Sequence, residues 1–346
     1  DTGTSYYALR FPDSGQASVT LPESLSTDLP SSFSFEAWVM LPGTVANGDP
    51  TTADGFYKTI VSRYAVRPDG TYHNRYADFN FQVQKTGNIN FFMGSGLSPN
   101  FYGIIITPAF LPAARWTHLA FSVYTPDGSA NPEYATVYVD GVPFNGTWKN
   151  GDRQLRQDVP IHLGAYLNQD GDVKWWRGFM DEVRFWSEYR TPTQIQDSMN
   201  LAVDANTPNL LAYYHCDSGS ILTDETRNYD GQFVSGAGSV TYQLSGVKLG
   251  FEVMVGKQGR VDIELPGVGE APFTYAIESV PDPSVGRLMV DGSIIFSDNV
   301  PFNLPSNMVT FEAADIEQGT TTFTYYGTNE NGREAGSTPV KVIIGV

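Results

Sequence analysis

Short alternation of apolar and polar residues, repeated along the whole chain, is the feature that most limits its fold. The pattern is clear in Phe33-Ser34-Phe35-Glu36-Ala37-Trp38-Val39 and in Asp78-Phe79-Asn80-Phe81-Gln82-Val83. Successive side chains of a β-strand point to opposite faces, so each segment predicts a strand with one buried face. Further strands are expected at residues 8–11, 17–21, 117–123, 135–139, 160–164 and 179–186. Many short strands separated by turns predict an antiparallel sandwich.

A second strand-rich region begins near Gly246. Its expected strands lie at residues 261–265, 273–277, 288–290, 308–311, 321–326 and 340–344. They fit within about 100 residues, the size of an immunoglobulin-like sandwich. We therefore expect a first domain over residues 1–245 and a second over 246–346. The one strong helix pattern covers residues 191–199, where Thr191 suits the N-cap and Gln194 can complete a capping box.

Charge and cysteine content exclude several classes of protein. The 346 residues include 21 Lys and Arg against 38 Asp and Glu, which gives a formal net charge of −17. Nucleic acid is not an expected partner, because phosphate binding needs a basic surface. The single cysteine, Cys216, excludes a disulfide framework within the chain. No apolar run reaches the roughly 20 residues of a membrane span, so membrane insertion is not expected.

Five segments occur in a characteristic order. They are Ala8-Leu9-Arg10-Phe11, residues 33–39, Arg115-Trp116-Thr117-His118-Leu119-Ala120-Phe121, Val137-Tyr138-Val139-Asp140-Gly141 and Gly178-Phe179-Met180-Asp181-Glu182-Val183-Arg184-Phe185-Trp186. Together they resemble the laminin-G-like, concanavalin-A-like jelly rolls. Residues 190–231 are similar to the tail that often follows this fold, so the resemblance covers roughly residues 5 to 240. The second region, through residues 322–332 and the final strand, resembles the cadherin-like or bacterial Ig-like repeats of surface proteins.

The resemblance implies an all-β fold, an antiparallel jelly-roll sandwich followed by a smaller Ig-like sandwich. It also implies a non-catalytic recognition or adhesion module, outside the cell or on its surface, that binds a glycan or a cell-surface protein. Such a chain would form part of a larger multidomain surface protein.

Two other functional classes remain open. Enzymes on a jelly-roll scaffold hydrolyse glycans with two carboxylates that face one cleft. The strand pattern Glu-x-Asp-x-x-Glu that commonly carries them is missing, and the adjacent Asp181 and Glu182 should point to opposite faces. We therefore expect no catalysis, with a carbohydrate-active enzyme or an accessory fragment of one as the alternative. The second alternative is a structural surface or stalk protein.

Calcium is the expected cofactor, because acidic loops can supply the oxygen ligands that this hard cation takes. The resemblance implies a structural calcium held by Asp181 together with the N-terminal segment, in which Asp13 is the candidate. A second acidic loop offers Asp170 and Asp172. For Asp170 and Asp172 the alternative is a solvated turn. For Asp181 it is a cap on a turn or an ion pair with Arg184 or Arg177.

Flat side chains are the expected ligand contacts, because the apolar faces of sugar rings stack on them. The candidates are Tyr72, His73, Tyr76, Tyr102, Trp148, Trp175 and Trp176. Most of them lie in loop-like contexts. Trp175 and Trp176 are adjacent in an expected strand, so one of the two should be exposed. Ordinary loop packing is the alternative for each candidate.

Overall fold

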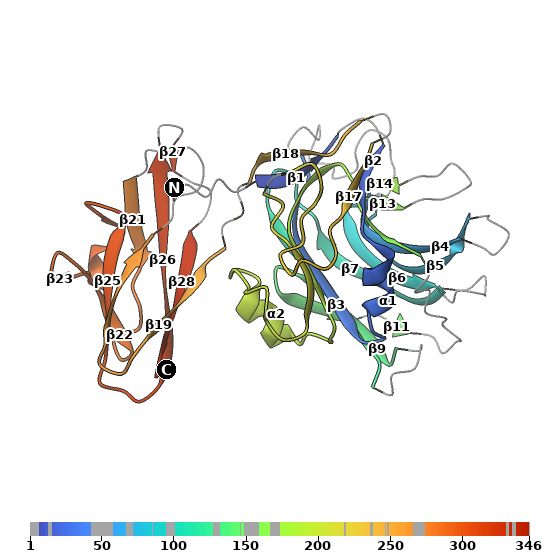
Figure 1. Ribbon diagram of the computed structural model, residues 1–346. Coiled ribbons are helices and arrows are strands. Elements are labelled where there is room, and N and C mark those ends of the chain that lie inside the picture. The colour runs from blue at the N-terminus through green and yellow to red at the C-terminus, as the bar shows by residue number, and fades with distance from the viewer. Residues whose placement is uncertain are drawn as a thin grey trace. The chain divides into compact units, whose positions relative to one another are not determined.

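The computed structural model describes residues 7–12, 16–42, 58–66, 72–84, 86–94, 101–126, 132–145, 147–148, 159–166, 174–217, 219–235, 238–245, 247, 249–265, 274–329, 332–333 and 337–345. For residues 64–66, 72–77, 94, 101–104, 110, 147–148, 244, 329 and 332–333 it describes the backbone alone. The chain divides into two compact units. The jelly-roll unit contains residues 7–196 and 204–243, and the C-terminal unit contains residues 197–203 and 244–346. Figure 1 colours the first unit mainly from blue to yellow and the second mainly in orange and red.

Sheet A of the jelly-roll unit has the strand order β10-β9-β8-β3-β15-β1-β18, with β16 also paired to β15. Its strands are β1 (Tyr7–Phe11), β3 (Phe33–Met40), β8 (Thr117–Tyr124), β9 (Tyr134–Val139), β10 (Val142–Asn145), β15 (Gly178–Trp186), β16 (Leu210–Tyr214) and β18 (Thr241–Leu244). A β-bulge shifts the register of β15 against β3 between Asp181 and Arg184. Glu182 lies at this bulge and has a positive φ of 52°.

Sheet B has the strand order β11-β7-β6-β5-β4-β12-β2-β17. Its strands are β2 (Ala17–Thr20), β4 (Lys58–Val66), β5 (Tyr72–Val83), β6 (Asn88–Gly94), β7 (Phe101–Phe110), β11 (Thr147–Trp148), β12 (Ile161–Leu163) and β17 (Gln232–Ser235). A small separate sheet pairs β13 (Ala165–Tyr166) with β14 (Lys174–Trp175).

The hydrophobic core lies between sheets A and B, because alternate residues of their central strands point inward. Phe35 of β3 and Phe121 of β8 meet Phe81 of β5 and Phe91 of β6, and all four are 0% exposed. The rings of Phe91 and Phe121 stack with centroids 4.2 Å apart. Phe35 meets Phe81 edge to face at 6.3 Å. The predicted all-β jelly-roll sandwich is confirmed.

Two short α-helices accompany the strands of the jelly-roll unit. The predicted helix is α2 (Pro192–Ser198). Its capping box is formed, because Gln194 N–H donates to Thr191 Oγ1 at 3.3 Å and Thr191 N–H donates to Gln194 Oε1 at 2.8 Å. Ile195 packs on Ala120 and Tyr138, so α2 covers part of the outer face of sheet A, the face turned away from the core. The other helix, α1 (Glu23–Asp28), was not expected from the sequence. No helix within the described ranges is long and apolar enough to span a membrane.

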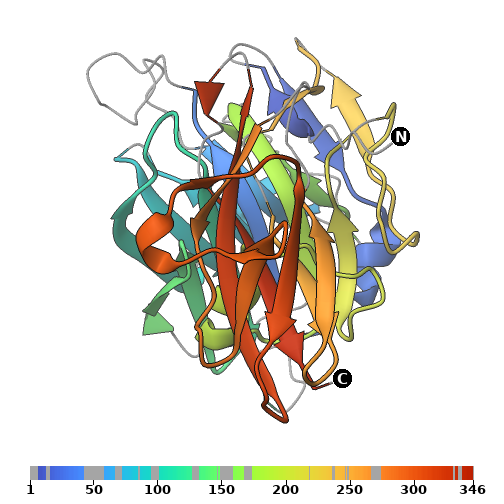
Figure 2. The same cartoon turned by 90° about the vertical axis from the view of Figure 1, so that its left-hand side faces the viewer.

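The C-terminal unit is a second sandwich of two sheets. One has the order β19-β28-β26-β21-β24 with β27 on β26, and the other has the order β20-β25-β22-β23. The strands are β19 (Phe251–Val255), β20 (Arg260–Glu264), β21 (Thr274–Ser279), β22 (Gly286–Val290), β23 (Ser293–Ile294), β24 (Phe302–Asn303), β25 (Met308–Ala313), β26 (Gly319–Asn329), β27 (Gly332–Arg333) and β28 (Thr338–Ile344), with a 3-10 turn, η2 (Ser297–Asn299). β19 runs parallel to β28. Phe311, Phe323 and Val340 are fully buried in its core. Figure 2 shows these strands, coloured mainly orange and red, from a second direction.

Candidate functional site

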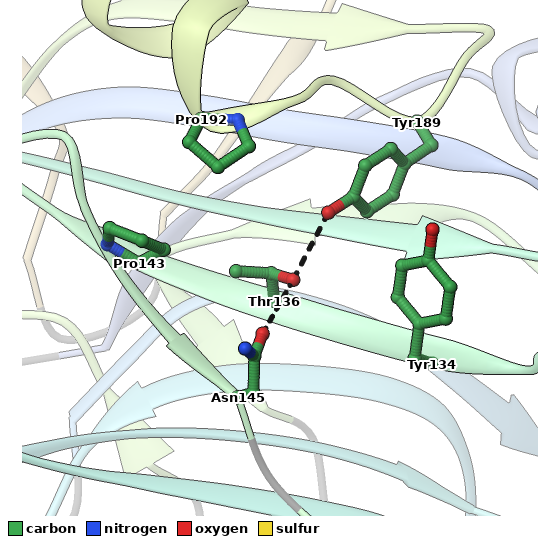
Figure 3. Close-up of a pocket in the computed structure, with 6 residues that line it drawn as sticks. All are labelled: Tyr134, Thr136, Pro143, Asn145, Tyr189 and Pro192. Carbon is green, nitrogen blue, oxygen red and sulfur yellow. Dashed lines mark hydrogen bonds between the residues drawn. The ribbon is translucent and has the colours of Figure 1, made fainter.

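A groove lies on the outer face of sheet A, beside β9 and β10 (Figure 3). Its volume is about 320 Å³. We name it the tyrosine groove, and its lining residues are Tyr134, Thr136, Pro143, Asn145, Tyr189 and Pro192. Figure 3 shows the two tyrosine rings on one side and the two proline rings on the other, with Thr136 and Asn145 between them.

The β9–β10 hairpin builds most of this groove. Its turn residues Asp140 and Gly141 have positive φ angles of 47° and 74°, as in the type I′ turn that Asp-Gly favours. A two-residue turn fixes the strand register, which places Thr136 directly opposite Asn145. Tyr134 lies two residues before Thr136 and therefore on the same face.

Aromatic packing holds the tyrosine side of the groove. The ring of Tyr134 stacks on Tyr124 with centroids 4.8 Å apart, and Tyr189 meets Tyr134 edge to face at 5.4 Å. Tyr134 nevertheless remains 39% exposed, so part of its ring is open to a ligand. Burial raises the pKa of Tyr134, and Tyr189, Tyr124 and Glu133 raise it further. The hydroxyl therefore stays protonated at neutral pH.

A chain of hydrogen bonds fixes the polar groups of the groove. Thr136 Oγ1 donates to Asn145 Oδ1 at 2.9 Å and lies 3.2 Å from the Tyr189 hydroxyl. Because the Thr136 proton is used on Asn145, Tyr189 is the donor of that second bond. Asn145 Nδ2 has no hydrogen-bond partner within the described part of the chain.

The segment that carries Tyr189 is itself anchored to sheet A. Tyr138 Oη donates to the Arg190 carbonyl at 2.9 Å, and Arg190 N–H donates to Ser34 Oγ at 2.9 Å. Both contacts come from side chains on the outer face of the sheet. The wall formed by Tyr189 is therefore held in place before any ligand binds.

A buried charged network on the same face was missed in the sequence. Glu36 of β3 is 0% exposed. It accepts a hydrogen bond from Trp186 Nε1 at 2.6 Å, and its Oε2 lies 3.0 Å from His118 Nε2. Burial alone raises the pKa of Glu36, but the His118 hydrogen bond and the charge of Arg184 lower it to about 2. Glu36 is therefore a permanent charge at the centre of the outer face.

Glu182 and His215 form a second charged pair, with Oε1 and Nδ1 2.9 Å apart. The Tyr213 hydroxyl also donates to Glu182. Burial raises the pKa of Glu182, yet His215 and Arg184 lower it overall. Burial lowers the pKa of His215, yet the hydrogen bond and charge of Glu182 raise it overall. His215 thus keeps its proton to a higher pH than an ordinary histidine.

Asp181, the main calcium candidate, is 2% exposed on β15, and its Oδ1 accepts the Glu182 N–H at 2.8 Å. The expectation that Asp181 and Glu182 point to opposite faces is wrong. Asp181 aligns with Trp38 on the outer face, and Glu182 forms an ion pair with Arg184 there. The physical reason is the bulge, which sets two residues of β15 against one of β3 and interrupts the alternation. Both carboxylates are buried, and neither lines the tyrosine groove.

The other predicted metal ligands, Asp13, Asp170 and Asp172, lie outside the described residues. Within the described residues, no group of three His, Cys, Asp or Glu side chains surrounds a possible metal position. Asp181 could supply one buried carboxylate oxygen to a calcium ion. The further ligands that calcium requires would have to come from other parts of the chain.

The predicted ligand contacts do not gather at the tyrosine groove. Five of them lie in strands β5, β7 and β11, where only the backbone is described: Tyr72, His73, Tyr76, Tyr102 and Trp148. Their side chains are outside the described part of the structure. Trp175 is half-buried in β14. Trp176 is 1% exposed and packs in the core, where its backbone N–H donates to the Gly164 carbonyl at 2.8 Å, so an exposed role is wrong for it.

A row of amides lies on the outer face of sheet B. Asn80 Nδ2 donates to Gln82 Oε1 at 3.0 Å, and Gln82 lies opposite Asn90 on the next strand. The Oδ1 atoms of Asn80 and Asn90 have no partner among the described residues. All three side chains are at most 3% exposed, so this row is closed to a polymer in the structure. The tyrosine groove is the more accessible candidate.

The chain is similar to the solved structures of several proteins. A Bacteroides ovatus protein proposed to bind carbohydrate is 20% identical, over 70% of this chain and 60% of that one, with a TM-score of 0.48. The chain thus spans less than two thirds of that protein's length. Domain 4 of AbnA, an extracellular arabinanase from Geobacillus stearothermophilus solved with arabinotriose, is 25% identical over 55% of this chain and 75% of that one, with a TM-score of 0.35. The CBM40 domain of a Ruminococcus gnavus sialidase is 10% identical over 55% of this chain and 95% of that one, with a TM-score of 0.40.

A search of curated proteins found no match. A family model does match, over residues 13–196, which is more than half of the chain. These residues include the central strands of both sheets and the β9–β10 hairpin of the tyrosine groove. The chain belongs to the concanavalin A-like lectin/glucanases superfamily.

Proposed function

We propose that this protein is a non-catalytic recognition or adhesion module, located outside the cell or on its surface, that binds a glycan in the tyrosine groove. The observation that carries the proposal is the Tyr134 ring, which is packed on Tyr124 yet 39% exposed, in one groove with Asn145, whose amide nitrogen has no partner among the described residues. A flat apolar surface next to a few fixed polar groups is the usual chemistry of a sugar site.

The groove provides both interactions that a sugar ring needs. The apolar C–H face of a pyranose or furanose can lie on Tyr134 and against the proline rings, while ring hydroxyls accept from Asn145 Nδ2 and exchange hydrogen bonds with the tyrosine hydroxyls. Because the hydrogen bonds at Thr136 and Tyr138 already hold Tyr189, little conformational entropy is lost on binding.

The groove lining supports binding rather than hydrolysis. None of its six residues is an acid, whereas glycoside hydrolysis uses two carboxyl groups roughly 5 to 9.5 Å apart across the scissile bond. The buried acids of sheet A, Glu36 and Glu182, are engaged by His118 and His215. A carbohydrate-active enzyme on this scaffold remains the alternative proposal.

Two further parts belong to the proposal. Calcium is proposed as a structural ion near Asp181, and its support is that Asp181 places a buried carboxylate, an oxygen ligand of the kind calcium takes, on β15. The C-terminal unit is proposed as an Ig-like spacer of a larger surface protein. Its support is the two-sheet sandwich whose first strand pairs in parallel with its last.

A glycan array followed by calorimetry with the best-bound oligosaccharide tests the glycan proposal. The protein is made in a bacterial host without N-glycosylation, because Asn145-Gly146-Thr147 is an acceptor sequon and a sugar on Asn145 would enter the groove. Tyr134→Ala should weaken binding roughly three- to tenfold, the usual worth of an aromatic contact.

Phe296→Ala is the matched control, because Phe296 is an exposed aromatic of the C-terminal unit, with 56% exposure, far from the groove in sequence. It should leave the affinity unchanged. Equal affinities of the parent and Tyr134→Ala would place the glycan elsewhere. Hydrolysis of the bound oligosaccharide would favour the enzyme alternative.

A further inference from the structure

We propose that the tyrosine groove selects uncharged sugar units and rejects sugars that carry carboxylate or sulfate groups. The inference rests on the proposed glycan binding in this groove and specifies the class of ligand. It follows from the chemistry of the lining, from the hydrogen-bond directions and from the charges around the groove.

The lining itself offers no charged group. It consists of two tyrosines, two prolines, one threonine and one asparagine. An acidic sugar in this groove would lose the water around its anionic group without gaining a cationic partner. Burial of an unpaired charge is strongly unfavourable, whereas neutral hydroxyls can exchange water for the hydroxyl and amide groups of the groove.

The free polar atoms suit hydroxyl groups. Asn145 Oδ1 is occupied by Thr136, which leaves the Nδ2 hydrogens as donors. Tyr189 donates to Thr136 Oγ1, which leaves its own oxygen as an acceptor. The Tyr134 hydroxyl can act in either direction. A sugar hydroxyl, which both donates and accepts, can meet each of these groups, whereas a carboxylate only accepts.

Of the residues that the structure describes, the charged ones next to the groove segments in sequence are negative or already paired. Glu133 precedes Tyr134 and is exposed, and Glu188 precedes Tyr189. The one cation of this segment, Arg190, lies with its guanidinium 3.7 Å from the centre of the Trp186 ring and 3.8 Å from Glu188. It is 6% exposed and is not one of the residues that line the groove. Among the residues that the structure describes, these neighbours offer an approaching anion two carboxylates and no unpaired cation.

The size of the groove limits the unit that is recognised. A volume of about 320 Å³ is at the lower end of ligand pockets, which begin at about 300 Å³. One sugar ring and part of a neighbour would fill it. The charge of that one ring therefore decides whether the glycan is accepted.

The experiment measures binding of matched oligosaccharides that differ only in charge. Neutral xylo-, manno- and galacto-oligosaccharides are compared with glucuronate-substituted, sialylated and sulfated forms of the same backbones, in 20 mM and 500 mM NaCl. The acidic forms should bind at least tenfold more weakly than the neutral ones at 20 mM NaCl. The difference should shrink at 500 mM NaCl without vanishing, because salt screens the repulsion but does not supply a partner.

Glu133→Lys tests the charge argument directly, and Glu133→Gln is its matched control. Glu133→Lys should raise the affinity for acidic forms severalfold while leaving the neutral affinity unchanged, and Glu133→Gln should have a smaller effect. One result would overturn this inference and still leave the groove a glycan site: an acidic glycan binds the parent as tightly as its neutral counterpart does, and the Tyr134→Ala variant binds that acidic glycan more weakly. Two other results would overturn both the proposed function and this inference. One is that no glycan binding depends on Tyr134, and the other is that the tyrosine groove binds a proline-rich peptide in preference to glycans.

Discussion

Replacing Glu36 with Gln removes the charge at the centre of the buried network on sheet A and keeps the size of the side chain. Burial raises the pKa of Glu36, but His118 and Arg184 lower it overall from its ordinary value of 4.5 to about 2 in the folded chain. At about 1.36 kcal/mol per pH unit, this difference corresponds to about 3 kcal/mol of stabilisation at neutral pH. The value agrees with the loss of about 3 to 5 kcal/mol that follows removal of one partner from a buried ion pair.

The dependence on pH follows from the sign of the shift. Because folding lowers the pKa of Glu36, its contribution is present above pH 4.5 and is lost as the pH falls toward 2. Urea unfolding of the parent and of Glu36→Gln, followed by tryptophan fluorescence, should therefore differ by about 3 kcal/mol at pH 7 and by less at pH 3. For a domain of this size the difference at pH 7 corresponds to about 6 to 12 °C in Tm.

Glu133→Gln is the control for Glu36→Gln, because it removes an exposed carboxylate from the same unit. Exposed charges contribute little, so its effect should stay below about 1 kcal/mol. A loss of less than 1 kcal/mol in Glu36→Gln at pH 7, or an equal loss at both pH values, would refute the reasoning about the network.

Two further perturbations test the remaining charged groups. Glu182 raises the pKa of His215 above its ordinary value of 6.5. The stabilisation of the folded chain by this pair is therefore present below pH 6.5 and is lost as the pH rises through the raised pKa. Urea unfolding between pH 6 and pH 9 should show this decline in the parent but not in His215→Gln. Calcium should raise the Tm of the parent relative to EDTA by about 5 to 10 °C at 100 times its Kd, an increase that Asp181→Asn should lose. Equal Tm values in calcium and EDTA, with no metal found by elemental analysis, would remove calcium from the proposal.

Local patterns predicted the parts of the fold that depend on near neighbours. The alternation in residues 33–39 correctly assigns Phe33, Phe35, Ala37 and Val39 to the core, where each is 0% exposed. The Asp140-Gly141 turn determines that Thr136 faces Asn145, so this half of the groove could have been found from the sequence. The capping pair Thr191 and Gln194 likewise marks the start of α2.

Distant packing explains what the sequence could not predict. Alternation assigns Glu36 to the outer face, but it does not show that β15, some 150 residues later, pairs with β3 and places Trp186 against Glu36. Tyr189 joins Thr136 across 53 residues of chain for the same reason. The bulge at Glu182 depends on how β15 pairs with β3 and β16, and no local pattern marks it. Sites assembled by such long-range packing need the structure.

The size and charge of the tyrosine groove together indicate how such a module would have to act. A hexose has about 12 non-hydrogen atoms, and at about 0.3 kcal/mol per atom it contributes about 4 kcal/mol, which corresponds to a Kd of about 1 mM. Without an ion pair to strengthen it, a single groove would bind weakly and reversibly. Weak sites become effective when many are presented together, because each further contact is made at a high effective concentration. A neutral, single-ring groove therefore suits adhesion to a repetitive glycan surface better than capture of a free sugar.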